Sequence, residues 1–565
     1  MKKYRYKEES DILFTIFCCL IIVCINLLIQ SSCDLPIMVD EIGYISYPAF
    51  ISGYRWNDAL CYVPYYGFGY GLFLVPVFLI CKSIRQIYTA IRILNCLFIV
   101  VIFLTVKKFG NEMWKGNHLN GTVYSLICCF IPGILVFKNY ALSEIIIIMV
   151  YSLMLLSFEK YITSGKTRWK TVFLFLNFYL LTIHLRMIGS VFASCILLAV
   201  YNLKLAKGSN AKRKNKKMFV LTAIMVLLIF LLAQSAISLS GIGKYDSANS
   251  LSEQIGRVIA ILNLRYMKSF LLLMVSRVWT YAVSYLGLFM VGMGGLITFI
   301  VREKDNRIIY TYIFLSFAFE FFINCVAMPR VSRLDIMFHT RYSEVCIIPI
   351  LYIGIMNVLE RKVNIRYIFG VLAITTGTYH VIPALFNMSK DVTEFLTICV
   401  PNVSIWWKDG RFEGVLATKA TVIFLLAAYF FSRMRNVLLK MVPLYFAAAI
   451  WISSAAKSIE NYENTLIVQK YDFMDEIDFI TKNHYQKIYA IVGTREYYVG
   501  RHYECWLQLA MPDCKIQCIP IEECYNCMDE KGAITVIPKR LIGIDEENYE
   551  EYFLCTTEYF CLLGR

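Results

Sequence analysis

The chain has 565 residues, of which 58% are hydrophobic and only 17% are charged, and its mean hydropathy is +0.58. Soluble domains need a polar surface and do not reach this composition, so a water-soluble enzyme is excluded and a polytopic membrane protein is predicted. The formal net charge is +15, but the basic residues form short clusters between apolar runs and no continuous basic face. This pattern argues against nucleic acid and favours membrane lipid headgroups and phosphate as partners.

The first apolar run, residues 12–29, follows a basic N-terminus and is not followed by a small-residue cleavage pattern. It predicts an uncleaved anchor with its N-terminus in the cytoplasm. Because about 20 apolar residues cross a bilayer, the chain is predicted to contain about 13 spans. The others are expected at residues 88–106, 121–137, 145–158, 172–183, 188–203, 219–237, 279–301, 309–326, 346–358, 368–385, 418–431 and 437–453.

A shorter apolar run at residues 71–79 contains Pro76 and is predicted to lie along the outer interface without crossing. The basic clusters after the later spans then all fall on the cytoplasmic side, as the positive-inside rule requires. These clusters lie at residues 107–115, 160–170, 212–217, 302–307, 360–366 and 433–435. An odd number of spans places the C-terminal region outside a plasma membrane.

The composition of the sequence changes near residue 455, where the apolar spans stop and acidic clusters begin. Short β-like runs at 488–492, 533–537 and 552–555 alternate with helical segments. We therefore predict an all-α membrane domain at 1–454 and a small extracytoplasmic α/β domain at 455–565. The latter region holds seven cysteines, an odd number, and their pairing does not follow from the sequence.

Two adjacent carboxylates, Asp40 and Glu41, follow the first span and are the predicted reaction centre. Carboxylates just outside a helix are often ordinary solvated loop residues. The predicted topology, however, brings further polar residues to the same outer face. They are Tyr44, Tyr140, Glu144, His184, Arg186, Arg330, Arg333, His339, Arg341, Tyr342 and the pair Trp406-Trp407.

Several of these residues also have a purely structural interpretation. Ser143 and Glu144 stand where a capping serine and an acidic first turn favour a helix start. Arg341 and Tyr342 precede a span, as interfacial anchors do. Arg186 lies among apolar neighbours close to the membrane, and the cost of burying its charge favours a functional role.

Three short motifs resemble those of the GT-C membrane glycosyltransferases, the group that includes protein O-mannosyltransferases and aminoarabinose transferases. They are Asp40-Glu41-x-x-Tyr44, Ser143-Glu144 and His339-Thr340-Arg341-Tyr342-Ser343-Glu344. The resemblance covers residues 1–453 in topology and motifs, and it implies transfer of a sugar from a polyprenyl-phosphate carrier to a hydroxyl acceptor with inversion. The acceptor would be a cell-surface glycan, a lipid or a protein.

The chemistry of such a transfer fits these residue types. A hydroxyl acceptor needs a carboxylate to take its proton, which is the role expected for Asp40 with Glu41 beside it. Tyr44, Glu144, Arg186, His339, Arg341 and Tyr342 are the expected substrate-binding residues, with arginine suited to the departing phosphate. No Asp-x-Asp motif and no zinc-type Cys/His spacing occur, so we expect no cofactor, while a divalent cation between Asp40 and Glu144 stays open.

Two other classes compete with this interpretation. A transporter or flippase for lipid-linked sugars would show internal repeats with paired Gly/Pro-interrupted spans, and no convincing repeat is present. A glycan polymerase or ligase would use large outer loops rich in Arg and His but would not need Asp40-Glu41 after the first span. A test of acceptor glycosylation against carrier translocation separates the enzyme from the transporter.

Overall fold

The computed structural model describes most of the chain. The described residues are 2–31, 39–61, 63, 66–114, 118–205, 228, 231, 235, 241, 251–327, 334–360, 365–382, 397–408, 411–469, 474–493, 503–539, 541, 551–557 and 559–564. The predicted span at 219–237 and the predicted outer residues Arg330 and Arg333 lie outside this part.

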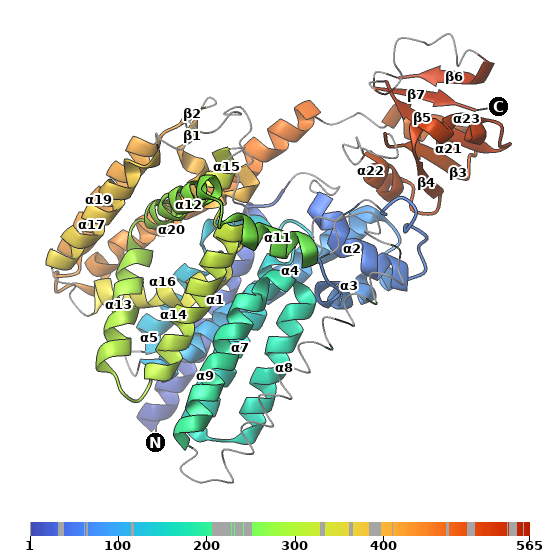
Figure 1. Ribbon diagram of the computed structural model, residues 1–565. Coiled ribbons are helices and arrows are strands. Elements are labelled where there is room, and N and C mark those ends of the chain that lie inside the picture. Colours follow the sequence, from blue (N-terminus) through green and yellow to red (C-terminus); the bar gives the residue numbers. More distant parts are fainter. Residues whose placement is uncertain are drawn as a thin grey trace.

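The C-terminal sheet domain lies to one side of the helical part, near helices α2, Val39–Ile51, and α3, Gly69–Ile80 (Figure 1). The longer helices of the helical part, in chain order, are α1 Lys2–Leu28, α2 Val39–Ile51, α3 Gly69–Ile80, α4 Ile84–Met113, α5 His118–Cys128, α6 Pro132–Phe137, α7 Glu144–Ser164, α8 Thr167–Ile183, α9 Ile188–Leu205, α11 Leu251–Ala260, α12 Leu264–Ser284, α13 Leu288–Arg302, α14 Arg307–Ala327, α16 Ile347–Leu359, α17 Ile365–Tyr379, α19 Gly414–Phe431 and α20 Val437–Gln469. Between them lie the short helices η1 Leu185–Met187, α15 Leu334–Met337, η2 Glu344–Cys346, η3 Thr397–Cys399 and η4 Pro401–Trp406, and a two-stranded ribbon of β1 Trp407–Lys408 and β2 Arg411–Phe412.

Six of the described helices are long and apolar enough to cross a membrane, or seven if one bent pair counts as a single span. The six are Ser10–Leu28 of α1, α4, α7, α14, α19 and Leu438–Asn464 of α20. The protein is therefore polytopic, as predicted, while the count of about 13 remains a prediction. Helices α5 and α16 belong to a shorter apolar class, and so does α3, the segment predicted to lie along the interface.

The predicted span at 279–301 is not one straight helix. Helices α12 and α13 meet there at a bend of 105°. Leu286 and Gly287 both adopt left-handed backbone angles, with φ of 51° and 77°, which no α-helix can contain. The predicted span at 121–137 is likewise divided, into α5 and α6, and α6 begins at Pro132.

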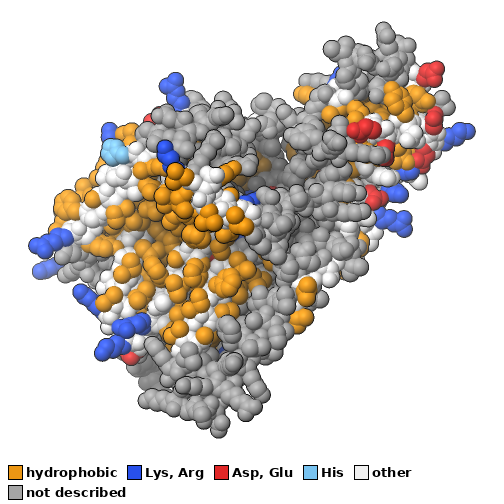
Figure 2. Space-filling model, in the orientation of Figure 1, with side chains coloured by type: hydrophobic (Ala, Val, Ile, Leu, Met, Phe, Trp, Pro, Cys, Tyr) orange, Lys and Arg blue, Asp and Glu red, His pale blue; other side chains and the backbone are white. Residues whose placement is uncertain are grey.

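The helical part is apolar inside and outside. Trp279, Tyr310 and Ile350 are fully buried, whereas Leu13, Phe175 and Ile423 are each more than 60% exposed. Figure 2 shows hydrophobic side chains spread over the visible face of this part. Such an exposed apolar surface is what a lipid-facing bundle presents.

The C-terminal domain contains a five-stranded sheet in the order β4-β3-β5-β7-β6. Its strands are β3 Lys487–Ile491, β4 Lys515–Ile519, β5 Ala533–Pro538, β6 Phe553–Thr556 and β7 Phe560–Leu563, and its helices are α21 Met474–Lys482, α22 Tyr503–Ala510, η5 Ile521–Glu523 and α23 Cys524–Met528. Strands β4 and β5 flank β3 in parallel, and β7 runs antiparallel to β5 and β6. The predicted domain boundary at residue 455 falls inside α20, which continues to Gln469.

Candidate active site

Four segments that are far apart in the sequence place their polar side chains together. Asp40 lies in the first turn of α2, and Glu144 is the first residue of α7. Arg186 lies in η1, between α8 and α9, and Arg341 lies in the turn before η2. Each side chain thus comes from a helix end or a connection, where the backbone does not repeat and a side chain can be aimed.

The four charged groups form one buried cluster, which we call the ion-pair cluster. Arg341 bridges its two carboxylates: Nη1 lies 3.2 Å from Oδ2 of Asp40, and Nε lies 2.6 Å from Oε1 of Glu144. Arg186 Nη2 lies 2.9 Å from the same Glu144 oxygen. Two guanidinium groups therefore balance two carboxylates, which offsets part of the cost of burying these charges.

Burial distinguishes the two carboxylates. The side chain of Glu144 is 1% exposed, whereas that of Asp40 is 27% exposed. Asp40 is therefore the carboxylate of the cluster that a substrate can reach. The buried carboxylate of Glu144 forms ion pairs with both arginines and so fixes the positions of their guanidinium groups.

Glu41 points elsewhere. Its side chain is fully buried and accepts a hydrogen bond of 2.7 Å from the backbone N–H of Ala141. Successive residues of a helix project about 100° apart, so adjacent carboxylates cannot both face one site. Through this hydrogen bond Glu41 links α2 to the turn before α7. Of the two adjacent carboxylates, only that of Asp40 belongs to the ion-pair cluster.

Aromatic rings surround Asp40 and Arg186. Tyr66 donates a hydrogen bond of 2.6 Å to Oδ1 of Asp40, and its ring stacks on Tyr44 with 5.0 Å between centroids. The guanidinium carbon of Arg186 lies 4.5 Å from the ring centroid of Tyr342. Tyr66 was not singled out from the sequence, because the first loop holds several tyrosines and their spacing does not say which one meets Asp40.

Ser143 does not cap α7 with its side chain. It has no side-chain capping bond and instead donates a hydrogen bond of 2.8 Å to the hydroxyl of Tyr44. The serine cap predicted for the Ser143-Glu144 motif is therefore absent, whereas Glu144 does stand in the first turn of α7, as the same interpretation predicted. The two residues bind Tyr44 and the arginines, respectively.

Two histidines border the cluster, of which His184 is half-buried and His339 is buried. His184 stacks on Tyr66 at 5.1 Å, and His339 meets Tyr342 edge-on at 4.7 Å. Burial lowers the pKa of each imidazole well below its usual value, and the charges of nearby arginines lower it further. Both histidines are therefore neutral at physiological pH, which leaves them as hydrogen-bonding groups without charge.

Three further buried polar residues lie near the cluster: Glu320 and Arg277 were missed, and Glu344, the last residue of the third motif, was given no role of its own. Glu320 in α14 accepts a hydrogen bond of 2.7 Å from the N–H of Ser190, next to the turn that carries Arg186. Glu344 accepts hydrogen bonds from Thr340 and Tyr285, each of 3.1 Å, and from Asn402. Arg277 is fully buried and bonds the backbone oxygen of Ile336. A lone glutamate within an apolar span was the available signal for Glu320, because charges there are rare.

The described residues contain no group of three or more His, Cys, Asp or Glu side chains that could hold a metal ion. The guanidinium of Arg341 already contacts both Asp40 and Glu144. A divalent cation between these carboxylates would have to displace that guanidinium.

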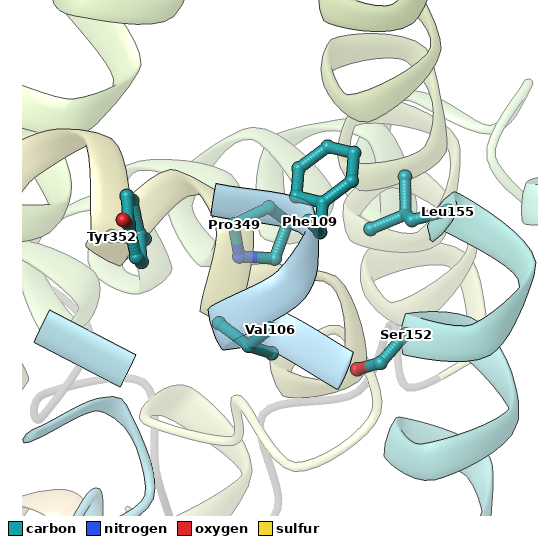
Figure 3. A pocket seen from close by; sticks show the side chains of 6 residues that line it. All are labelled: Val106, Phe109, Ser152, Leu155, Pro349 and Tyr352. Carbon is teal, nitrogen blue, oxygen red and sulfur yellow. The ribbon is translucent and has the colours of Figure 1, made fainter. Parts of the chain in front are cut away.

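A small pocket lies between α4, α7 and α16, inside the bundle (Figure 3). Its lining residues are Val106, Phe109, Ser152, Leu155, Pro349 and Tyr352. The hydroxyl of Ser152 is engaged with the backbone oxygen of Ile148. The other lining side chains are apolar except for Tyr352.

Comparison with solved structures identifies the fold. The chain is similar to ArnT from Cupriavidus metallidurans bound to undecaprenyl phosphate, with a TM-score of 0.51 and 13% identity over 98% of this chain and 97% of that one. It is also similar to the oligosaccharyltransferase of Archaeoglobus fulgidus, with a TM-score of 0.43 and 12% identity over 93% of this chain and 69% of that one. Both are GT-C glycosyltransferases. The predicted resemblance to this group is thus confirmed for the fold.

No protein-family model matches the chain, and a search of curated proteins found no match.

Proposed function

We propose that the protein is a membrane glycosyltransferase that moves a hexose or pentose from a polyprenyl-phosphate carrier to a hydroxyl acceptor, with inversion. The observation that carries this proposal is the accessible carboxylate of Asp40, held by Tyr66 and Arg341 at the edge of a buried ion-pair cluster. The likeness to a structure with bound undecaprenyl phosphate supports the choice of carrier. The acceptor class stays as broad as predicted: a glycan, a lipid or a protein.

In the proposed reaction the acceptor oxygen attacks the anomeric carbon while Asp40 takes the hydroxyl proton. The bond between the anomeric carbon and the phosphate oxygen breaks, and its electron pair leaves with the carrier phosphate. Attack from the side opposite the leaving group inverts the anomeric centre. Charge therefore develops on the phosphate, where donors fixed in advance are most effective.

Arg341 and Arg186 are the proposed phosphate ligands. Their guanidinium groups are fixed by Glu144, so little reorganisation is needed when phosphate charge develops. Tyr44, Tyr342 and His339 are proposed to line the sugar and phosphate positions. Glu41 is proposed to act through the position of α2, since its own carboxylate is buried against Ala141.

The test is transfer of label from radiolabelled polyprenyl-phosphate sugars in membranes that contain wild type or Asp40→Asn. The amide keeps the volume of the side chain and removes the base, so transfer should fall by about 10²–10⁴-fold. Asp305→Asn, at an exposed position between α13 and α14, is the matched control and should leave transfer unchanged. Substantial transfer by Asp40→Asn would show that Asp40 is not the general base.

The same membranes separate enzyme from transporter. Movement of the labelled carrier across the bilayer, without transfer to any acceptor, would contradict the proposed transferase and indicate a transporter of lipid-linked sugars.

A further inference from the structure

Part of the first loop is enclosed by the C-terminal domain. Ala59 is fully buried and belongs to the hydrophobic core of that domain, together with Ile480 and Leu507. The indole N–H of Trp56 donates a hydrogen bond of 3.1 Å to the backbone oxygen of Pro512. The thiol of Cys518, in β4, lies 3.5 Å from the backbone oxygen of Ala59. We call residues 56–61 the clasp segment.

The contact also runs in the opposite direction. Cys505 and Leu509 of α22 belong to the core of the helical part, and Trp506 packs against both cores. Figure 1 shows α22 on the side of the C-terminal domain that faces α2 and α3. The interface is therefore a buried apolar one, unlike the polar and mobile contacts expected between independent domains.

The clasp segment is close in sequence to the proposed base. Tyr66 comes five residues after Cys61, and its hydroxyl bonds Asp40 at 2.6 Å. On its other side the chain is fixed by Gly67, whose φ of 152° and whose contact with the backbone oxygen of Thr182 leave no room for a Cβ. Tyr66 thus lies along the chain between the clasp segment, which contacts the C-terminal domain, and Gly67, which contacts the end of α8.

We propose that the C-terminal domain is a positioning element for the reaction centre: by enclosing the clasp segment it holds Tyr66 against Asp40. This inference rests on the proposed function for its catalytic consequence, but the docking itself does not. Ala59 and Trp56 are the positioning residues, because they contact the C-terminal domain and would act on Asp40 only through Tyr66.

The docking is tested first, with a pair of native thiols as the probe. Cys518 faces the clasp segment, since its thiol lies 3.5 Å from the backbone oxygen of Ala59, and Cys61 lies two residues further along that segment and helps to raise the pKa of the Cys518 thiol. Diamide takes two electrons and two protons from such a pair, which becomes a disulfide while diamide becomes its hydrazine. Mass spectrometry of the full-length protein should detect a peptide linked through Cys61 to Cys518 in wild type. Ala59→Arg should lose this link. The matched substitution Asn57→Arg, which introduces the same side chain at a half-buried neighbouring position, should keep it.

The catalytic consequence is tested by transfer kinetics. Ala59→Arg should lower kcat at least about tenfold with little change in the KM for the donor, as expected when a hydrogen bond to a charged group is lost. Tyr66→Phe should lower kcat by a similar factor. The double variant should have the same kcat as Tyr66→Phe alone, because both substitutions remove the same hydrogen bond from Tyr66 to Asp40. Trp56→Phe, which keeps an aromatic ring, should lower kcat in the same direction.

Three results would overturn the inference: a Cys61–Cys518 link that persists in Ala59→Arg, full kcat in an undocked variant, or additive losses in the double variant. Absence of transfer by wild type from any donor would instead contradict the proposed function, while the linkage experiment would still decide whether the domain docks.

Discussion

Arg341 contacts Asp40 through one nitrogen and Glu144 through another. A lysine carries a single ammonium group on a flexible stem and cannot reproduce this pair of contacts in a fixed geometry. We expect Arg341→Lys to raise the KM for the polyprenyl-phosphate donor by about tenfold or more, because a charge-assisted contact is worth more than about 1.5 kcal/mol.

Transfer rates measured over a range of donor concentrations check this expectation. Arg435→Lys, an exposed position between α19 and α20, is the control and should behave as wild type. An unchanged donor dependence in Arg341→Lys would exclude Arg341 as a phosphate ligand.

His339 makes stability depend on pH. Burial lowers its pKa well below the usual value, and Arg277, Arg341 and Arg186 lower it further. In the unfolded chain histidine titrates near about 6.5, so below this pH the unfolded state binds a proton that the folded state does not. The free energy of unfolding should therefore fall as the pH drops below 6.5, until the folded imidazole also protonates.

The unfolding temperature of the purified protein in detergent, measured between pH 7 and pH 5, checks this dependence. His339→Gln should lose less stability over that interval than wild type, whereas His380→Gln, at an exposed position, should lose as much. Equal losses in all three proteins would contradict the role given to His339. His184 has its pKa lowered by burial in the same way and contributes in the same direction.

At this scale the sequence identified residue types but not their geometry. Arg186 was chosen because charge near lipid is costly, whereas Asp40, Glu144 and Arg341 were chosen because the predicted topology put them on one face and their motifs resemble those of a known group. The structure brings all four into one cluster. That Glu41 turns away depends on the helical phase of α2, which a loop prediction for this stretch could not supply.

Among the elements, the turn that carries Arg186 depends on α14. Glu320 is 1% exposed and accepts the N–H of Ser190, at the start of α9. Glu320→Ala would leave this buried N–H without its acceptor, at a cost of about 1–3 kcal/mol. We expect a lower unfolding temperature and, because η1 is released, a higher KM for the donor.

Glu320→Gln is the matched variant, because its amide oxygen can still accept the hydrogen bond. It should recover most of the stability and donor affinity that alanine loses. If glutamine and alanine behave alike in thermal unfolding and in donor KM, the hydrogen bond to Ser190 does not position the turn.

The helix breaks show why spans were harder to predict than sites. Gly287 stands in an apolar run in which an isolated glycine is tolerated, so nothing at the sequence level predicts a bend of 105° there. The bend is fixed by long-range packing, since a Cβ on Gly287 would strike Leu425 of α19. The run at 121–137 did contain Pro132, which is a helix-start signal, but its apolar length made a single span the simpler prediction.

On the scale of the whole molecule, charge separates the two ends of the bundle. Glu144 opens α7 and Lys160 lies near its end, so at 1.5 Å per residue they are about 24 Å apart along the helix. Lys160 pairs with Glu112 near the end of α4, far from the ion-pair cluster. Figure 2 also shows Lys and Arg side chains along the left edge and at the top of the helical part, and both acidic and basic side chains on the C-terminal domain. The orientation of the bundle in the membrane stays a prediction from the positive-inside pattern.

The predicted orientation can be tested with native and introduced thiols. Cys527 lies in α23 of the C-terminal domain, which is predicted to be outside, and its thiol is half-buried. Asp305 is exposed between α13 and α14, in a connection that is predicted to be cytoplasmic. A membrane-impermeant maleimide applied to intact cells should therefore label Cys527 and should label the Asp305→Cys variant at position 305 only after the membrane is permeabilised.

Peptide mass spectrometry distinguishes the two sites within one sample, so each is an internal control for the other. Labelling of position 305 alone in intact cells would invert the topology. It would also place Asp40 and the C-terminal domain in the cytoplasm together, because the buried contact between Ala59 and that domain keeps the first loop and the domain on the same side.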